Sequence, residues 1–215
     1  MSKRLALAVL ISGNGSNLQA IIDAVEAGCL NAEIRTVVSN NPDAYGLVRA
    51  SAHGIDSHVL DHRDFAEREQ FDAELQAHLE ALDPDFIVLA GFMRILGPAF
   101  IEAFAGRILN IHPSLLPAYK GLNTHQRALD NNEPRHGVSI HLVTAELDDG
   151  PVLVQASYPI EAGDGVEELQ KKGHRLEHRM YPAVLSWLSE NKLTIEGGQV
   201  LHEQALLEQP LVFKP

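Results

Sequence analysis

The amino-acid sequence predicts an α/β protein with a doubly wound, mostly parallel sheet and helices on both faces. Two uninterrupted apolar runs, at 5–11 and 86–90, have the length of strands and lack polar alternation. Such runs are typical of strands buried on both faces. Segments with apolar residues at helical spacing separate the runs, and this alternation is the pattern of a parallel sheet with crossover helices.

The first part of the chain supplies the parallel strands. After the first run, Leu18, Ile21 and Val25 recur at helical spacing, and Gly28 is a suitable C-terminal stop. A second helical stripe ends at Asp83-Pro84. The expected elements in order are strand 5–11, helix 18–25, strand 34–38, helix 43–53, strand 57–60, helix 71–82 and strand 86–90.

The second part predicts fewer and longer elements. Strand 108–111 is followed by strands 138–143 and 152–158, which flank a connecting loop at 148–150. Apolar residues at helical spacing over 169–188 indicate a long last helix, bent near Pro182. The tail has two weak strand patterns, 193–195 and 200–202, and the chain contains no repeat or linker. One domain over 1–215 is therefore expected.

Composition narrows the classes of partner. Acidic residues outnumber basic ones by 29 to 17, giving a net charge of −12, which argues against nucleic-acid or membrane-surface binding. The net charge does not argue against binding of a small anionic ligand, because a few local donors suffice to hold it. Cys29 is the one cysteine of the sequence, so no intrachain disulfide can form. No apolar stretch reaches the roughly 18 residues of a membrane helix, and we expect a cytoplasmic protein, monomeric or homodimeric.

The loop at 13–17 follows the first strand and precedes the first helix. Ligands bind at this position in doubly wound sheets. Its glycines let the backbone approach a phosphate, and the helix start adds free N–H groups and a positive dipole end. Ser16 and Asn17 add side-chain hydrogen bonds. The sequence therefore predicts a phosphate site, although plain turn and cap roles stay open.

The same loop does not match a dinucleotide fingerprint. Leu18 occupies the position of the third glycine, and the second strand ends in Ser39-Asn40-Asn41 without an acidic residue for a ribose hydroxyl. The Gly-Lys pair of a Walker loop is also missing. A small phosphorylated ligand fits the loop better than a dinucleotide.

The segment around Asn110 and His112 follows a buried strand, so it also lies at the carboxyl edge of the predicted sheet. In an extended segment these two side chains share one face and Ile111 points to the other. An amide donor beside an imidazole is a plausible pair for polarising a carbonyl oxygen. Asp148 lies downstream in the loop between two strands.

Two other kinds of site have to be weighed for this part of the chain, a metal site and a serine hydrolase. Asn110, His112, His141 and Asp148 offer metal-ligand atoms, but the sequence has no helical His-Glu-x-x-His motif and no cysteine cluster. A serine hydrolase built on Ser114 lacks the nucleophile-elbow pattern. On residue type alone, a structural or surface role is the better expectation for His125, His136 and His141. We therefore expect no metal.

Four long motifs occur in order: ISGNGSNLQ at 11–19, LAGFMRIL at 89–96, LNIHPSLLP at 109–117 and ELDDGP at 146–151. Through these motifs, and over about 7–188, the chain resembles the phosphoribosylglycinamide formyltransferase family. The resemblance implies a formyltransferase-like fold. It also implies transfer of the formyl group of 10-formyltetrahydrofolate to the amine of glycinamide ribonucleotide in purine synthesis. The implied partners are these two small molecules.

The resemblance also implies residue roles. Asn110, His112 and Asp148 would be catalytic, with Asp148 favouring the charged imidazole and accepting or relaying the amine proton. The ribonucleotide half would be about 1–100 and the folate and catalytic half about 85–190. The residues implied for the ribonucleotide are Gly15, Ser16, Asn17 and Glu177. Those implied for the folate are Arg68, Leu89, Phe92, Met93, Arg94, Ile95, Leu96 and Asn110.

A few positions depart from the family pattern. Gly173 follows two lysines where a better helix former is expected, His174 stands where some relatives have glutamine, and Asn123 where several have histidine. The resemblance further suggests a cis bond at Leu116-Pro117. The alternatives left open are a formyltetrahydrofolate deformylase, a methionyl-tRNA formyltransferase-like enzyme and an inactive folate-binding protein.

Overall fold

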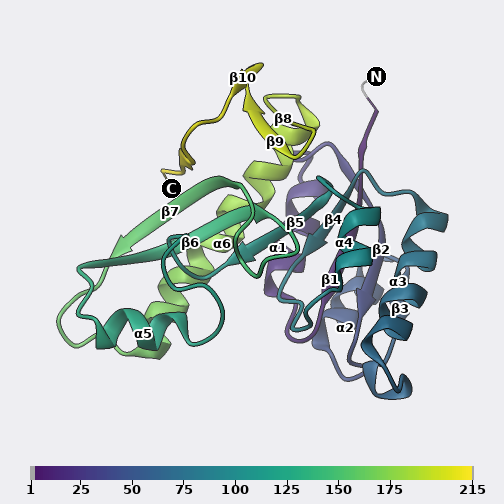
Figure 1. The fold of residues 1–215 in the computed structure, drawn as a ribbon, viewed down its shortest axis with the longest axis horizontal. Coiled ribbons are helices and arrows are strands. Elements are labelled where there is room, and N and C mark those ends of the chain that lie inside the picture. Colours follow the sequence, from purple (N-terminus) through teal and green to yellow (C-terminus); the bar gives the residue numbers. More distant parts are fainter. Residues whose placement is uncertain (1–2, 215) are drawn as a thin grey trace.

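The computed structural model describes residues 3–214 (Figure 1), so Met1, Ser2 and Pro215 of the expected domain lie outside the described residues. An eight-stranded sheet forms the centre, in the order β11-β7-β6-β5-β4-β1-β2-β3. The pairs formed by β1, β2, β3, β4 and β5 among themselves are parallel, whereas β6 pairs antiparallel with both β5 and β7. The predicted fold class, α/β with a mostly parallel sheet, is confirmed.

The predicted strands and long helices all occur. The elements are β1 (Leu5–Ile11), α1 (Ser16–Glu26), β2 (Ala32–Ser39), α2 (Tyr45–Ala52), β3 (Ser57–Val59), α3 (Arg68–Leu82), β4 (Phe86–Leu89), α4 (Pro98–Ala103), β5 (Ile108–His112), α5 (Thr124–Asp130), β6 (Arg135–Leu142), β7 (Val152–Pro159), α6 (Val166–Ser189), β8 (Leu193–Glu196), β9 (Gln199–His202), β10 (Ala205–Leu206) and β11 (Leu211–Val212). Sequence periodicity missed α4, α5, β10 and β11, which are too short to show a stripe of apolar residues.

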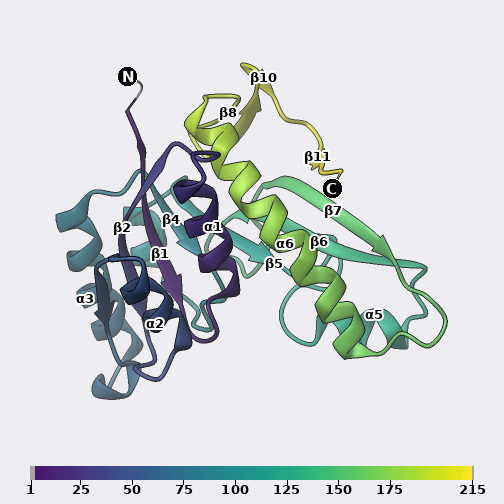
Figure 2. The same ribbon diagram turned by 180° about the vertical axis from the view of Figure 1, so that it is seen from behind.

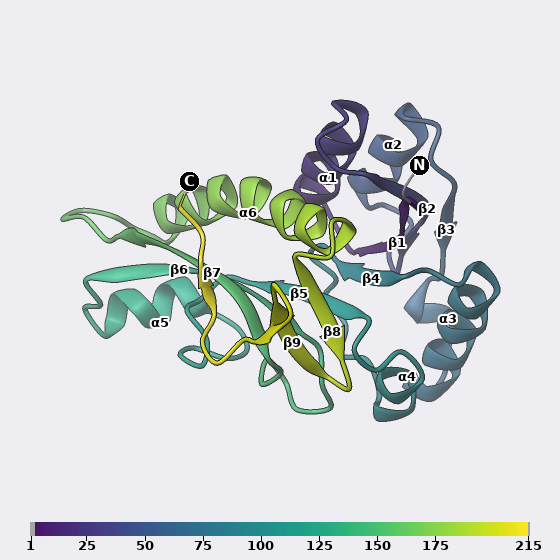
Figure 3. The same ribbon diagram turned by 90° about the horizontal axis from the view of Figure 1, so that it is seen from above.

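Alternate residues of the central strands pack against different helices. Leu7 and Val9 of β1 belong to one core with α1 and α6, and Leu10 belongs to a second core with α3. Figures 2 and 3 show α1, α2 and α6 on one side of the sheet and α3 and α4 on the other. The helices therefore cover both faces, as the fully apolar strands predicted.

The long helix α6 ties the sheet together. It runs through Pro182 without interruption, and its Tyr181 is fully buried. The Tyr181 hydroxyl lies 3.2 Å from the carbonyl oxygen of Leu89 and 3.0 Å from that of Leu109. These carbonyls belong to neighbouring strands, so α6 anchors the segments that carry the site.

The C-terminal tail forms a small sheet, β10-β9-β8, and then returns along β7 as β11. Leu116-Pro117 is a cis peptide bond, as expected. Within residues 3–214, no helix is long and apolar enough to cross a bilayer.

Candidate active site

The candidate site lies where three neighbouring parallel strands end. β5, β4 and β1 are adjacent in the sheet, and the predicted catalytic, folate and phosphate segments follow or end these strands in that order. Parallel strands bring their carboxyl ends to one edge, where ligands bind in open α/β sheets. The strand order thus brings together three motifs that are far apart in the sequence.

The phosphate loop, residues 13–17, turns sharply into α1. Gly15 adopts a left-handed conformation with φ 73°, and no side chain caps the helix. A Cβ atom on Gly15 would lie 2.7 Å from the Gly46 Cα, so only glycine fits between the loop and α2. The first N–H groups of α1 are left for a ligand, and the helix dipole favours an anion.

Arg49, which the sequence did not indicate, holds this loop from α2. Its guanidinium donates to the Asn14 carbonyl at 2.9 Å, to the Asn14 side chain at 3.2 Å and to Gln19 at 3.1 Å. A cavity of about 420 Å³ beside the loop is lined by Ser16, Gln19, Ala20, Asp23, Arg49 and His178. The Arg49 guanidinium and the N–H groups at the start of α1 are the positive contributions beside this cavity, and Asp23 lies on its wall.

Glu177 connects α6 to the phosphate loop. Its carboxylate accepts a hydrogen bond from Asn17 Nδ2 at 2.8 Å, and both side chains are buried. Burial raises the pKa of Glu177, and the Asn17 hydrogen bond opposes this only partly. Asn17 Oδ1 is buried without a hydrogen-bond partner. The sequence-predicted pair thus meets in the structure, with an unused acceptor beside it.

The predicted catalytic residues converge from β5 and the loop after β6. His112 Nδ1 lies 3.4 Å from Asp148 Oδ2, and both side chains are more than nine-tenths buried. Asn110 Nδ2 lies 3.1 Å from Nε2 of His141, its partner across the antiparallel β5–β6 pair. His141 Nε2 in turn lies 3.6 Å from Asp148 Oδ1. The cluster therefore contains a second histidine, for which the sequence had favoured a structural role.

Hydrogen bonds to backbone carbonyls fix the tautomers of both rings. His112 donates its Nε2–H to the Tyr119 carbonyl at 2.9 Å, and His141 donates its Nδ1–H to the Leu142 carbonyl at 2.8 Å. A carbonyl only accepts, so a neutral His112 presents a bare Nδ1 towards Asp148. That nitrogen is the one left to exchange a proton, and a proton there would pair with the carboxylate.

The pKa directions follow from burial and these contacts. Burial lowers the pKa of His112, and it outweighs the opposing effects of the Tyr119 carbonyl and the Asp148 charge. Asp148 acts in the expected direction, towards the charged imidazole, but burial of His112 has the larger effect. Burial acts to raise the pKa of Asp148, but His141, the Gly121 N–H and His112 together bring it below its ordinary value. Both directions favour a carboxylate at Asp148 beside a neutral imidazole at His112.

The segment after β4 presents apolar side chains outward. Met93 and Ile95 are 75% and 62% exposed, whereas Phe92 and Leu96 are buried. The Met93 N–H donates to Ser12 Oγ at 2.7 Å, which ties the segment to the end of β1. The large exposed hydrophobic residues of the site loops are Met93, Ile95, Leu122 and Leu147.

The two arginines implied for the folate differ in position. Arg94 turns inward, with its guanidinium carbon 4.7 Å from the Phe71 ring centroid and its Nε buried without a partner. Arg68, the first residue of α3, is partly exposed and lies 4.0 Å from Asp72. Asp72 also accepts the Gly97 N–H at 2.8 Å, so it joins α3 to the end of the segment.

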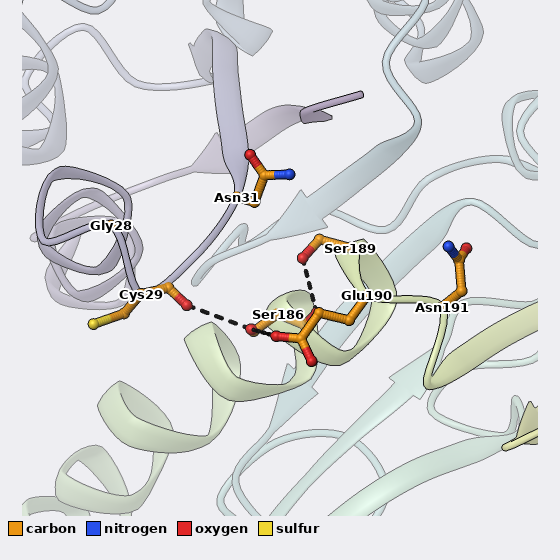
Figure 4. Close-up of a pocket in the computed structure, with 7 residues that line it drawn as sticks. All are labelled: Gly28, Cys29, Asn31, Ser186, Ser189, Glu190 and Asn191. Atoms are coloured by element: carbon orange, nitrogen blue, oxygen red, sulfur yellow. Dashed lines mark hydrogen bonds between the residues drawn. The ribbon is translucent and has the colours of Figure 1, made fainter. Parts of the chain in front are cut away.

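A second cavity, of about 370 Å³, lies away from this chemistry. It is lined by Gly28, Cys29, Asn31, Ser186, Ser189, Glu190 and Asn191, at the ends of α1 and α6 (Figure 4). The Cys29 thiol points away from the other lining side chains. This cavity faces the amino end of β2, opposite the carboxyl edge. Among residues 3–214, no group of three or more His, Cys, Asp or Glu is placed to hold a metal ion.

Comparison with known proteins finds a matching family and similar structures. A family model described as formyl transferase matches residues 5–185. The chain is 50% identical over 199 residues to phosphoribosylglycinamide formyltransferase of Escherichia coli (strain K12), covering 93% of this chain and 91% of that protein. The solved phosphoribosylglycinamide formyltransferase of Coxiella burnetii, in complex with CHES, is 49% identical with a TM-score of 0.93, covering 99% of this chain and 100% of that one. The enzyme of that name from Haemophilus influenzae is 46% identical over 192 residues, covering 89% of this chain and 91% of that protein.

Proposed function

The chain belongs to the formyl transferase family, and on that premise we propose that it transfers a formyl group from 10-formyltetrahydrofolate to the amine of glycinamide ribonucleotide. The reaction is a step of purine synthesis. In this proposal the protein works in the cytoplasm on two small-molecule substrates, and the folate is a co-substrate.

One observation supports the proposal most strongly. The phosphate loop, the 92–96 segment and the Asn110–His112 pair follow or end the adjacent strands β1, β4 and β5. A phosphorylated amine bound at the phosphate loop and a folate bound at the 92–96 segment would meet next to Asn110 and His112. The ribonucleotide half of the chain is then about 1–100 and the folate and catalytic half about 85–190.

The phosphate loop suits a phosphate monoester. Gly15 allows close backbone approach, and the first turn of α1 offers the N–H groups of Ser16 and Asn17. Arg49 adds positive charge next to them. In this proposal Glu177, whose Oε2 accepts from Asn17, accepts a further hydrogen bond from the rest of the ribonucleotide.

The residues around the 92–96 segment suit a flat heterocycle. Leu89, Phe92 and Leu96 give a buried apolar base, and Met93 and Ile95 stand exposed beside it. An apolar slot with a few backbone donors and acceptors is the usual form of such a site. In this proposal Arg68, which is partly exposed at the start of α3, meets the charged end of the folate. Arg94 contributes through its backbone while its side chain packs on Phe71.

The chemistry follows from the protonation states. The neutral amine attacks the formyl carbon, and negative charge develops on the formyl oxygen. An amide carries two hydrogens; one Asn110 Nδ2–H pairs with His141, and the other serves the oxyanion. The amine proton passes to His112 Nδ1, where Asp148 stabilises the imidazolium. The carbon–nitrogen bond to the folate then breaks, and the folate nitrogen takes up the proton.

A turnover assay with three acceptors tests the proposal. The protein is given 10-formyltetrahydrofolate together with glycinamide ribonucleotide, methionyl-tRNA or water alone, and tetrahydrofolate release is followed. Fast release with the ribonucleotide alone is expected. Equal release with water would indicate a deformylase, a preference for the charged tRNA would indicate the other transferase, and no release would indicate an inactive binding protein.

A further inference from the structure

The segment 118–122 touches both predicted proton-transfer residues through its backbone. The Tyr119 carbonyl accepts the His112 Nε2–H at 2.9 Å, and the Gly121 N–H donates to Asp148 Oδ2 at 2.9 Å. Backbone groups cannot be adjusted by rotating a side chain. The geometry of the His112–Asp148 pair therefore depends on the path of this segment.

The path is held in a conformation that an isolated chain disfavours. Tyr119 has φ 58°, in the left-handed region where an ordinary side chain meets its own carbonyl. Such a conformation persists only when surrounding contacts impose it. The contacts of the Tyr119 side chain can supply that restraint.

Those contacts come from the end of α5 and the turn after it. The Tyr119 hydroxyl donates to Glu133 Oε1 at 2.6 Å and accepts from Asn131 Nδ2 at 3.0 Å. The Arg127 guanidinium carbon lies 5.2 Å from the centroid of the Tyr119 ring, and Arg127 Nη1 donates to the Lys120 carbonyl at 2.6 Å. Lys120 also forms an ion pair with Asp149, next to Asp148.

We propose that Tyr119 is a positioning residue for the reaction: its hydroxyl, held by Glu133 and Asn131, fixes its own carbonyl against His112 and so sets the orientation and proton affinity of the imidazole. The inference rests on the proposed function. It assigns a task to a phenol whose hydroxyl is bound to Glu133 and Asn131. The Tyr119 carbonyl favours the protonated ring, in opposition to burial. The other titratable or charged groups that act on or near His112 are Asp148, His141, His136, His125 and Arg127.

Removal of one hydroxyl tests this directly. Tyr119→Phe keeps the ring and its contact with Arg127 but removes both hydrogen bonds of the hydroxyl, the one to Glu133 and the one from Asn131. We expect kcat to fall about three- to tenfold, the size of one hydrogen bond. The Michaelis constants of both substrates should change little. An NMR titration should show the pKa of His112 displaced downward, because its acceptor is less well held.

Glu133 provides the matched controls. Glu133→Gln keeps an acceptor for the phenol and should behave like the wild type. Glu133→Leu removes that acceptor but leaves the Asn131 bond, so it should lower kcat in the same direction as Tyr119→Phe and by no more. The double variant Tyr119→Phe/Glu133→Leu should be no slower than Tyr119→Phe alone, because Tyr119→Phe already removes the bond to Glu133. Unchanged kcat and His112 pKa in a folded Tyr119→Phe protein, or losses that multiply in the double variant, would overturn the proposal. The NMR arm needs no turnover, so a failed proposed function would be recognised separately by wild-type inactivity.

Discussion

Gly15→Ala tests the phosphate loop most sharply. Gly15 has φ 73°, and a Cβ there would lie 2.7 Å from the Gly46 Cα. Ordinary contacts begin at 3.4 Å, so the loop and α2 must separate by about 0.7 Å. The atom that the Cβ meets is backbone, and Gly46 is itself packed on the Ile11 side chain. The loop rather than α2 is therefore expected to move.

The size of the effect follows from the bonds that this movement breaks. A hydrogen bond to a charged group contributes about 1.5–3 kcal/mol. Loss of one N–H contact to the phosphate should therefore raise the ribonucleotide KM about 10- to 100-fold. The folate KM should stay within about twofold of the wild type, since the 92–96 segment follows a different strand. Steady-state kinetics with each substrate varied in turn gives both constants.

Gly28→Ala is the matched control. Gly28 has φ 70°, but a Cβ there meets nothing within 4 Å, so this variant isolates the left-handed backbone penalty of about 1–2 kcal/mol. It should lower the thermal midpoint and leave both Michaelis constants unchanged. An unchanged ribonucleotide KM in Gly15→Ala, or an equal rise for the folate, would refute the reasoning.

Three further changes test the scaffold. Tyr181→Phe removes a buried hydroxyl that lies 3.2 and 3.0 Å from two strand carbonyls and should lower the free energy of unfolding by about 1–3 kcal/mol in urea titrations; an unchanged value would show that water or another group replaces it. In Gly173→Ala the new Cβ would lie 3.7 Å from its nearest neighbour, the Tyr158 hydroxyl. The change should stabilise α6 by about 0.5–1 kcal/mol, whereas a lower free energy of unfolding would reveal a clash. Burial lowers the pKa of His136 to about 4 from 6.5, so the unfolded chain binds more protons between these values and stability should fall as the pH drops from 6.5 towards 4. His136→Gln should flatten that slope, and an equal slope in both proteins would contradict it.

The sequence predicted the parts of the site that lie at strand ends. A buried strand of a parallel sheet brings the residues at its end, such as Asn110 and His112, and the glycines that follow it to the carboxyl edge of the sheet. The long helices could also be predicted from the sequence, because their apolar stripes span several turns. Asp148 was found through its motif and its loop.

Contacts that depend on the register of strand pairing could not be predicted from the sequence. Asn110 faces His141 because β5 and β6 pair antiparallel in one register, and no local pattern reveals that register. Arg49 reads as an ordinary helix residue until α2 is docked against the phosphate loop. Tyr119 acts through its carbonyl, which every residue possesses. Residue type therefore carries no signal for these contacts.

Turnover of 10-formyltetrahydrofolate with glycinamide ribonucleotide, measured for wild type, His112→Ala, Asp148→Asn and the double variant, tests the central claim most directly. Each single variant should lose about 10²–10³ in kcat. The double variant should be little slower than the worse single one, because the pair at 3.4 Å handles one proton as a unit. Either single variant within tenfold of the wild-type kcat, or losses that multiply in the double variant, would contradict the account.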